Sequence, residues 1–205
     1  MAGAGERAIA ARVAARLLAA ILALLLAPPT AAQAPARVQL DTDAGIIVIE
    51  LDLKRAPITA GNFLRYAQEK RFDGTTFYRA ARNKRDPKIG LVQGGINHKA
   101  VRARLPIKHE PTSVTGLRHV DGTVSMARNA PGTAMGDFFI TVGPNTYLDA
   151  RPGSVGYAAF GRVVRGMDIV KRMLAAQTWP GGRSENTMGQ YIRKPIRIRS
   201  ARRVR

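Results

Sequence analysis

The sequence predicts a mainly β protein, a closed antiparallel barrel with a helix at each end. Short apolar runs with a period of two recur along the chain and are separated by short turns. Two segments between these runs show helical spacing instead. We find no internal repeat and no second domain. Many short strands combined with two helices are typical of a barrel whose openings are covered by helices.

The N-terminal residues predict a secretory signal peptide ahead of the barrel. An uncharged apolar run over residues 17–27 is followed by two prolines and small residues, and three arginines precede it: Arg7, Arg12 and Arg16. This order is typical of a signal peptide over residues 1–32, with cleavage after Ala32 or Ala34. The alternative is an uncleaved membrane anchor, but the run is shorter than the ~20 residues that span a bilayer. The sequence therefore predicts export.

The first strand is expected over residues 45–53. Its inward face consists of Ile47, Ile49, Leu51 and Leu53, and Glu50 and Asp52 lie on the other face. A helix should then begin at Pro57, because the first turn of a helix does not use the N–H that proline lacks. Its buried stripe consists of Ala60, Phe63, Leu64 and Ala67, and the helix should end near Lys70.

The remaining elements are shorter. Strands are expected over residues 76–79, 90–93, 122–128, 138–142 and 157–164, and a helix over residues 167–174. The last strand should span residues 195–204, with Ile196 and Ile198 inward and Arg197 and Arg199 outward. Irregular connections remain over residues 80–89, 97–117, 143–156 and 180–190.

The chain is strongly basic, with a formal net charge of +19. Without residues 1–32 it keeps 30 basic and 13 acidic residues, a net charge of +17. Such a field favours contact with anionic surfaces such as lipid headgroups, envelope polysaccharide or nucleic acid, and it opposes self-association, so we expect a monomer. The alternative is a basic surface that is simply solvated. No RNA-binding or zinc-finger motif accompanies the charge, so we expect no specific nucleic-acid partner.

Metal and thiol chemistry are not expected. The chain has no cysteine, which removes thiol nucleophiles and cysteine metal sites. The three histidines, His98, His109 and His119, show no spacing of four residues that would place two on one helix face. We interpret each as a surface or hydrogen-bonding residue.

Motifs for bond-breaking chemistry are also lacking. The sequence has no G-x-S-x-G elbow, no phosphate-binding loop and no dinucleotide fingerprint. What remains is an arginine beside apolar and polar residues on neighbouring strands: Phe77, Arg79, Leu91, Gln93, Phe139, Tyr147 and Leu148. An arginine next to an apolar cup, without a nucleophile or base, suits a reaction in which no bond is cleaved.

Several motifs in order resemble the cyclophilin peptidyl-prolyl isomerases. They are "FDGTTFYR", "GLVQGG", "PIKHE", "GTVSMAR", "FFITV", "YLD" and "GYAAFGRVVRGMDIVKRM", and the resemblance covers residues 38–202. It is strongest to the exported bacterial branch of the family. The resemblance implies one eight-stranded antiparallel barrel capped by two α-helices and an isomerase that assists the folding of exported proline-containing polypeptides, in the periplasm and without a cofactor or metal.

The resemblance also implies a role for each site residue. Arg79 would stabilise the twisted amide, and Gln93 would bind the substrate backbone and steady Arg79. Leu91, Phe139 and Leu148 would form the cup for the proline ring, with Phe77 beneath it. The residues before proline would lie beside Ala127 and Arg128. Tyr157 and Tyr147 occupy positions where histidine and tryptophan or phenylalanine are more usual, and the missing tryptophan predicts weak cyclosporin binding.

Three departures from the family pattern concern the same site. Gly90 and Leu91 stand where phenylalanine and methionine are usual, and a basic insert, residues 80–88, lengthens the link between Arg79 and Gln93. Asp137 replaces the usual glutamine, and we expect its carboxylate to pair with Arg79 and partly cancel its charge. These departures predict a slower isomerase whose preference is shifted toward particular flanking residues. Alternatively, the basic insert supplies compensating charge near the pocket. Two alternatives stay open: a proline-binding module or holdase without turnover, and a basic envelope or nucleic-acid-associated protein.

Overall fold

The computed structural model describes residues 35–97 and 99–204, so the predicted signal peptide and His98 lie outside the described residues. Within them are eight strands: β1 (Arg37–Thr42), β2 (Gly45–Leu51), β3 (Thr76–Arg82), β4 (Gly90–Gly95), β5 (Thr123–Met126), β6 (Asp137–Val142), β7 (Ala158–Arg165) and β8 (Tyr191–Val204). The α-helices are α2 (Pro57–Gln68), α3 (Thr112–Thr115) and α4 (Met167–Leu174).

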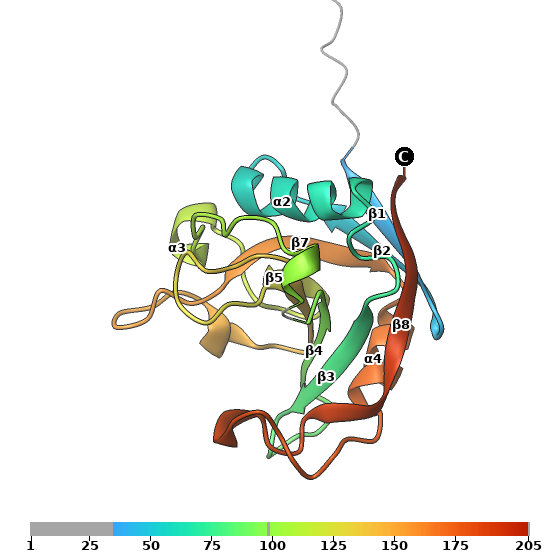
Figure 1. Cartoon of the computed structure of the whole chain (residues 1–205). Coiled ribbons are helices and arrows are strands. Elements are labelled where there is room, and N and C mark those ends of the chain that lie inside the picture. The colour runs from blue at the N-terminus through green and yellow to red at the C-terminus, as the bar shows by residue number, and fades with distance from the viewer. Residues whose placement is uncertain (1–34, 98, 205) are drawn as a thin grey trace, which may run out of the picture. The chain divides into compact units, whose positions relative to one another are not determined.

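The strands close into a single antiparallel barrel, as predicted (Figure 1). Their order around the barrel is β1-β2-β7-β5-β6-β4-β3-β8, and β8 pairs with β1 to complete it. The sequence pattern does not single out β1, although Val38 and Leu40 alternate inward along it. The order places β6 and β4 between β5 on one side and β3 with β8 on the other, and this arrangement sets the layout of the site.

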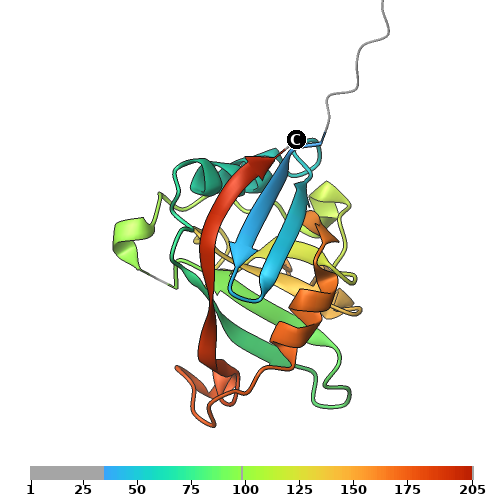
Figure 2. The same ribbon diagram turned by 90° about the vertical axis from the view of Figure 1, so that its right-hand side faces the viewer.

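Helices α2 and α4 lie at opposite ends of the barrel (Figures 1 and 2). Helix α2 begins at Pro57 and α4 spans Met167–Leu174, both as predicted. The Glu110 carboxylate accepts the N–H groups of Ile58 and Thr59, which have no partner within the first turn of α2. The single turn α3 is not predicted. None of the helices in the described ranges is long and apolar enough to cross a membrane.

Several strand ends differ from the prediction. Strand β4 ends at Gly95 rather than at residue 93, and β5 ends at Met126 rather than at residue 128. Strand β2 ends at Leu51, so Leu53 is not on the inward face and its side chain is 39% exposed. Strand β3 continues to Arg82, into the segment predicted to be irregular. Strand β8 begins at Tyr191 rather than Pro195, because the register with β3 shifts there and the shift tolerates a proline that cannot donate to the ladder.

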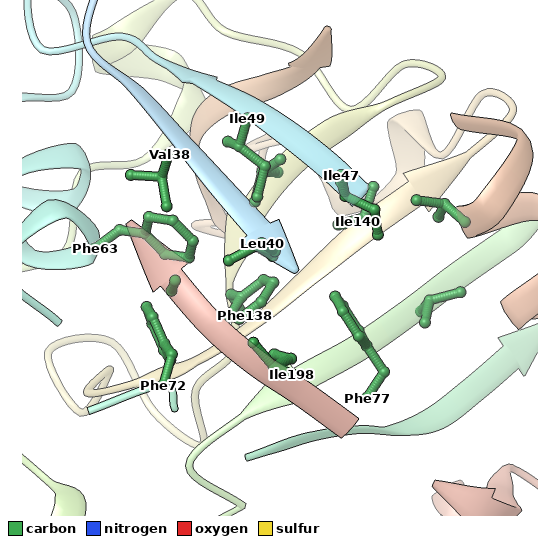
Figure 3. Close-up of a cluster of buried hydrophobic side chains, with 14 of the residues drawn as sticks. Val38, Leu40, Ile47, Ile49, Phe63, Phe72, Phe77, Phe138, Ile140 and Ile198 are labelled. Carbon is green, nitrogen blue, oxygen red and sulfur yellow. The ribbon is translucent and has the colours of Figure 1, made fainter. Parts of the chain in front are cut away.

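The barrel interior is filled by aliphatic and aromatic side chains (Figure 3). Phe138 on β6 lies at its centre, and its ring centroid is 5.1 Å from that of Phe63 on α2 in an edge-to-face contact. Ile140, two residues along β6, also points inward. Because side chains alternate along a strand, Asp137 and Phe139 are directed to the outer face.

Candidate active site

An apolar cup lies on the outer face of β4 and β6. It consists of Leu91, Phe139 and Leu148, and Ala81, Ala127 and Tyr157 pack against it. Leu91 and Phe139 come from the adjacent strands, and Leu148 from the short 3-10 helix Thr146–Leu148. The cup lies in a groove of about 720 Å³. The three residues predicted to form a proline cup are therefore together, and Ala81, from the basic insert, extends its wall.

A bulge in β3 aims Arg79 at this groove. Phe77 pairs with Gly94 and Arg79 with Gln93, so Tyr78 is an extra residue that has no counterpart on β4. Phe77 and Ala80 face the core, whereas Tyr78 and Arg79 both line the groove. Strict alternation would place Arg79 on the same side as Phe77, in the barrel interior. The bulge therefore brings a guanidinium to the edge of the cup.

Two glutamine side chains hold Arg79. Its Nη1 donates to Gln93 Oε1 at 2.7 Å, and its Nε donates to Gln190 Oε1 at 2.8 Å. Gln190 Nε2 in turn donates to the Asn186 carbonyl oxygen at 2.9 Å. The contact with Gln93 is the one that the sequence predicts. Gln190 lies in a segment predicted only as irregular, 111 residues away along the chain, and no local pattern identifies it.

Asp137 does not pair directly with Arg79, which corrects the prediction from the sequence. Within the described residues the link runs through two side chains: Gln93 Nε2 donates to the Tyr78 hydroxyl at 2.7 Å, and that hydroxyl donates to Asp137 Oδ1 at 3.1 Å. The backbone N–H of Asn97 donates to the same oxygen at 2.7 Å. Burial, followed by the charge of Asp137, raises the pKa of Tyr78. The carboxylate is thus a buried anchor behind Arg79.

His119 supports the cup from behind. Its ring stacks on Phe139 with centroids 5.9 Å apart, and the side chain is fully buried. Nδ1 donates to Asp149 Oδ1 at 2.7 Å, so Nε2 accepts from the Ser125 hydroxyl at 3.0 Å. Burial, only partly offset by Asp149, lowers the pKa of His119. His109 is half-buried, and its Nε2 lies 3.3 Å from the Val155 carbonyl oxygen.

Gly90 has a structural reason to lack a side chain. Its φ is +158°, and a Cβ built there would lie 2.1 Å from the carbonyl oxygen of Ala81 on β3. The extra length of β3 pairs with β4 at this point, where Arg82 lies opposite Gly90. The insert and the missing aromatic residue at position 90 are therefore one change, because the longer hairpin occupies the space of that side chain.

The other predicted residues divide into two groups. Ala127, Arg128, Tyr147 and Tyr157 line the groove, with the Arg128 guanidinium 4.8 Å from the Tyr157 ring centroid. Phe77 does not reach it: the side chain is fully buried in the barrel, 5.6 Å from Phe138 between ring centroids. Phe77 therefore belongs to the core rather than to the substrate surface.

Comparisons with known proteins agree with this geometry. Residues 37–203 match the family described as cyclophilin type peptidyl-prolyl cis-trans isomerase/CLD. A peptidyl-prolyl cis-trans isomerase of Acinetobacter baylyi is 36% identical over 166 residues, 79% of this chain and 84% of that protein. Peptidyl-prolyl cis-trans isomerase A of Dickeya dadantii is 36% identical over 85% of this chain and 88% of its own length.

A solved structure shows the same fold. It is a cyclophilin type peptidyl-prolyl cis-trans isomerase of Cryptosporidium parvum, with a TM-score of 0.64 and 19% identity over 83% of this chain and 98% of that one. The family match runs from the first residue of β1 to within one residue of the end of β8, and the two bacterial relatives are 36% identical over their aligned residues. This chain belongs to the cyclophilin-type peptidyl-prolyl cis-trans isomerase family.

Proposed function

We propose that this protein accelerates rotation about Xaa-Pro bonds in exported polypeptides and so assists their folding. The observation that carries the proposal is Arg79, whose guanidinium is held by Gln93 and Gln190 at the edge of the cup formed by Leu91, Phe139 and Leu148. In this arrangement the apolar cup can bind the proline ring while the guanidinium contacts the amide next to it.

The chemistry requires no bond to break. Rotation about an amide costs about 18–20 kcal/mol, because the nitrogen lone pair is delocalised into the carbonyl. In the twisted amide the prolyl nitrogen regains its lone pair, which can then accept a hydrogen bond from Arg79. A donor that binds this state better than the planar one lowers the barrier, and each 1.4 kcal/mol of preferential binding gives about a tenfold rate. The apolar cup holds the ring while the rest of the amide rotates.

The predicted signal peptide supports action on exported substrates. We propose the periplasm as the compartment and a monomer as the active form, because the net charge of +17 that remains without residues 1–32 opposes self-association. Expression of the full chain in a two-membrane bacterium, followed by fractionation and intact-mass analysis, tests this. A periplasmic product that begins at Gln33 or Pro35 is expected, and an unprocessed cytoplasmic product would contradict export.

The activity is tested with the purified full chain and an Ala-Pro peptide, by NMR exchange spectroscopy. We expect the wild type to accelerate exchange, and Arg79→Ala and Arg79→Lys to lose at least about 90% of kcat/KM, because lysine cannot contact both glutamines with a planar fork. Arg165→Ala serves as the matched control, since Arg165 is exposed on β7 and does not line the groove. Peptide binding without acceleration by the wild type would instead indicate a proline-binding module.

A further inference from the structure

The groove around the cup carries an excess of uncompensated positive charge. Four arginines line it, Arg79, Arg82, Arg128 and Arg183, and the only carboxylate among its described lining residues is that of Asp137. The Arg82 guanidinium is directed at the C-terminal carbonyl groups of α4. Asp137 is 5% exposed, and its Oδ1 is bonded to Tyr78 and Asn97, behind the surface. We propose that the groove selects proline-containing segments with Asp or Glu on both sides of the proline. This rests on the proposed isomerase function and names its substrate class.

The arginines flank the cup on two sides. Arg128 directly follows Ala127 at the end of β5, on one side of the pair β6 and β4 that carries Phe139 and Leu91. Arg82 on β3 and Arg183, in the connection to β8, lie on the other side, since β3 and β8 follow β4 in the barrel order. A peptide that crosses the cup therefore meets a guanidinium before and after its proline.

These charges are not neutralised within the described residues. None of the four arginines forms an ion pair with a described carboxylate. Arg82 donates to the carbonyl oxygens of Leu174 and Ala176, at the C-terminus of α4, and Arg128 donates to that of Gly156. The Gly156 carbonyl orients the Arg128 guanidinium without cancelling its charge, whereas the negative end of the α4 dipole offsets part of the charge of Arg82. In addition, Arg128 Nε is buried with no hydrogen-bond partner among the described residues.

The surroundings strengthen the field rather than offset it. The loop between β3 and β4 adds the exposed residues Lys84, Arg85 and Lys88 beside Arg82. Two acidic residues, Asp86 and Glu185, lie in the neighbouring loops, but neither lines the groove. Arg183 is exposed, with its guanidinium 5.3 Å from the Tyr191 ring centroid, so its donors are open to a ligand. The partner that fits this surface is an acidic peptide.

The test uses the full chain and peptides with capped termini. All peptides share a central Ala-Pro and differ only at the residues two positions before and two positions after the proline. Glutamate, glutamine or lysine is placed at both positions, and two further peptides carry glutamate on one side and glutamine on the other. The Ala-Pro bond itself is unchanged, so its intrinsic cis content is held constant. Because each partly exposed ion pair contributes modestly, we expect the Glu peptide to bind about 5- to 20-fold more tightly than the Gln peptide in 20 mM NaCl, and the Lys peptide to bind more weakly than either. The difference should shrink to about 2-fold in 500 mM NaCl.

Two variants show which charge acts. Arg183→Gln should remove most of the advantage of a Glu placed after the proline and keep that of a Glu placed before it. Arg203→Gln removes the same charge from an exposed site on β8 that does not line the groove, so it should keep both. Equal effects of the two variants would show that net charge, rather than the groove, attracts acidic peptides and would overturn the proposal.

Rates of cis-trans exchange are recorded on the same samples. The isomerase function and the preference for acidic peptides can therefore be rejected independently. If the Gln peptide is isomerised and the Kd values of the Glu and Gln peptides are equal, the isomerase function stands and the acidic preference is wrong. If no peptide is isomerised, the function is wrong, while the ratio of Kd values still decides the preference. A lower Kd for the Lys peptide than for the Glu peptide would contradict the acidic preference, whether or not the peptides are isomerised.

Discussion

Arg79 and Asp137 are the two ends of a hydrogen-bond chain whose direction is fixed by chemistry. A guanidinium can only donate and a carboxylate can only accept. Gln93 must therefore turn its oxygen toward Arg79 and its NH₂ group toward Tyr78, and the Tyr78 proton must point to Asp137. Each group has one orientation that satisfies both neighbours. The carboxylate, expected from the sequence to weaken Arg79, instead fixes its position from a distance.

Removal of the Tyr78 hydroxyl tests this chain. In Tyr78→Phe, Gln93 Nε2 and Asp137 Oδ1 each have one hydrogen-bond partner fewer, so the amide of Gln93 loses its fixed orientation. We expect kcat to fall about 5- to 20-fold with little change in KM, and the free energy of unfolding to fall by about 1–2 kcal/mol. Exchange kinetics and urea unfolding measure the two effects.

Tyr191→Phe is the matched control for that experiment. Tyr191 stacks on Tyr78 with ring centroids 6.3 Å apart, and its hydroxyl makes no hydrogen bond within the described residues. The same chemical change there should leave kcat within about twofold of the wild type. If Tyr78→Phe also keeps the wild-type kcat, the chain does not position Arg79.

The residues of the site differ in how well sequence reasoning finds them. Arg79, Gln93 and the three cup residues follow from motifs, and the structure brings them together. Gln190 and His119 act through contacts with distant parts of the chain, which no local pattern encodes. Tyr78 reaches the groove because of a bulge, and the bulge depends on pairing with β4 rather than on the residues of β3 alone.

At the scale of elements, the helices follow from the sequence more closely than the strand ends do. Helix α4 has its predicted bounds, because a glycine precedes it and a strong apolar stripe defines it. Strand β3 runs three residues further than predicted, since its end is decided by pairing with β4 across the basic insert. The end of a strand depends on its partner, whereas a helix makes its hydrogen bonds internally.

The hairpin of β3 and β4 should not tolerate a side chain at Gly90. Gly90→Ala places a Cβ 2.1 Å from the Ala81 carbonyl oxygen, so the strands must separate next to Leu91. We expect a loss of about 2–4 kcal/mol in the free energy of unfolding and a raised KM, because Ala81 and Leu91 both form the cup. Urea unfolding and exchange kinetics measure these effects.

Gly61→Ala provides a control of opposite sign. Gly61 lies within α2, and a Cβ built there meets no atom within 4 Å. Alanine favours a helix over glycine by up to about 1 kcal/mol, so this variant should be more stable than the wild type. A Gly90→Ala protein as stable as the wild type would show that the hairpin adjusts without cost, and the longer β3 would then not explain the glycine.

For the whole molecule, part of the basic charge is used to join strands. Glu50 on β2 receives hydrogen bonds from Arg37 on β1 and from Arg162 on β7, its lateral neighbours in the sheet. Asp73, in the turn before β3, accepts from Arg202 and so ties that turn to β8. The net charge can be read from the sequence, but which arginines pair with carboxylates cannot, because cross-strand pairs depend on register. The arginines of the groove stand apart, since they have no acidic partner among the described residues.

This use of charge predicts loss of stability in acid. Hydrogen bonds from Arg162 and then Arg37 hold the pKa of Glu50 below its ordinary value of 4.5, and those from Arg202 lower the pKa of Asp73. A carboxylate whose pKa is lower in the folded than in the unfolded state stabilises the fold above its unfolded pKa. That contribution disappears as the pH falls through the folded pKa. The free energy of unfolding should therefore fall steeply below about pH 4.5, where net positive charge also grows.

Glu50→Gln distinguishes the contribution of the Glu50 ion pairs with Arg37 and Arg162 from the destabilisation that acid causes through the rest of the protein. At pH 7 the variant should be less stable than the wild type by about 1 kcal/mol, because both arginines lose a charged partner that is itself only partly exposed. As the pH falls through the lowered pKa of Glu50, the wild-type carboxylate is protonated and the difference in free energy of unfolding between the two proteins should shrink toward zero in urea unfolding. Glu185→Gln, at an exposed carboxylate without an ion pair in the described residues, should follow the wild type throughout. A Glu50→Gln deficit that stays constant as the pH is lowered would mean that Glu50 stabilises the barrel by packing rather than by its charge.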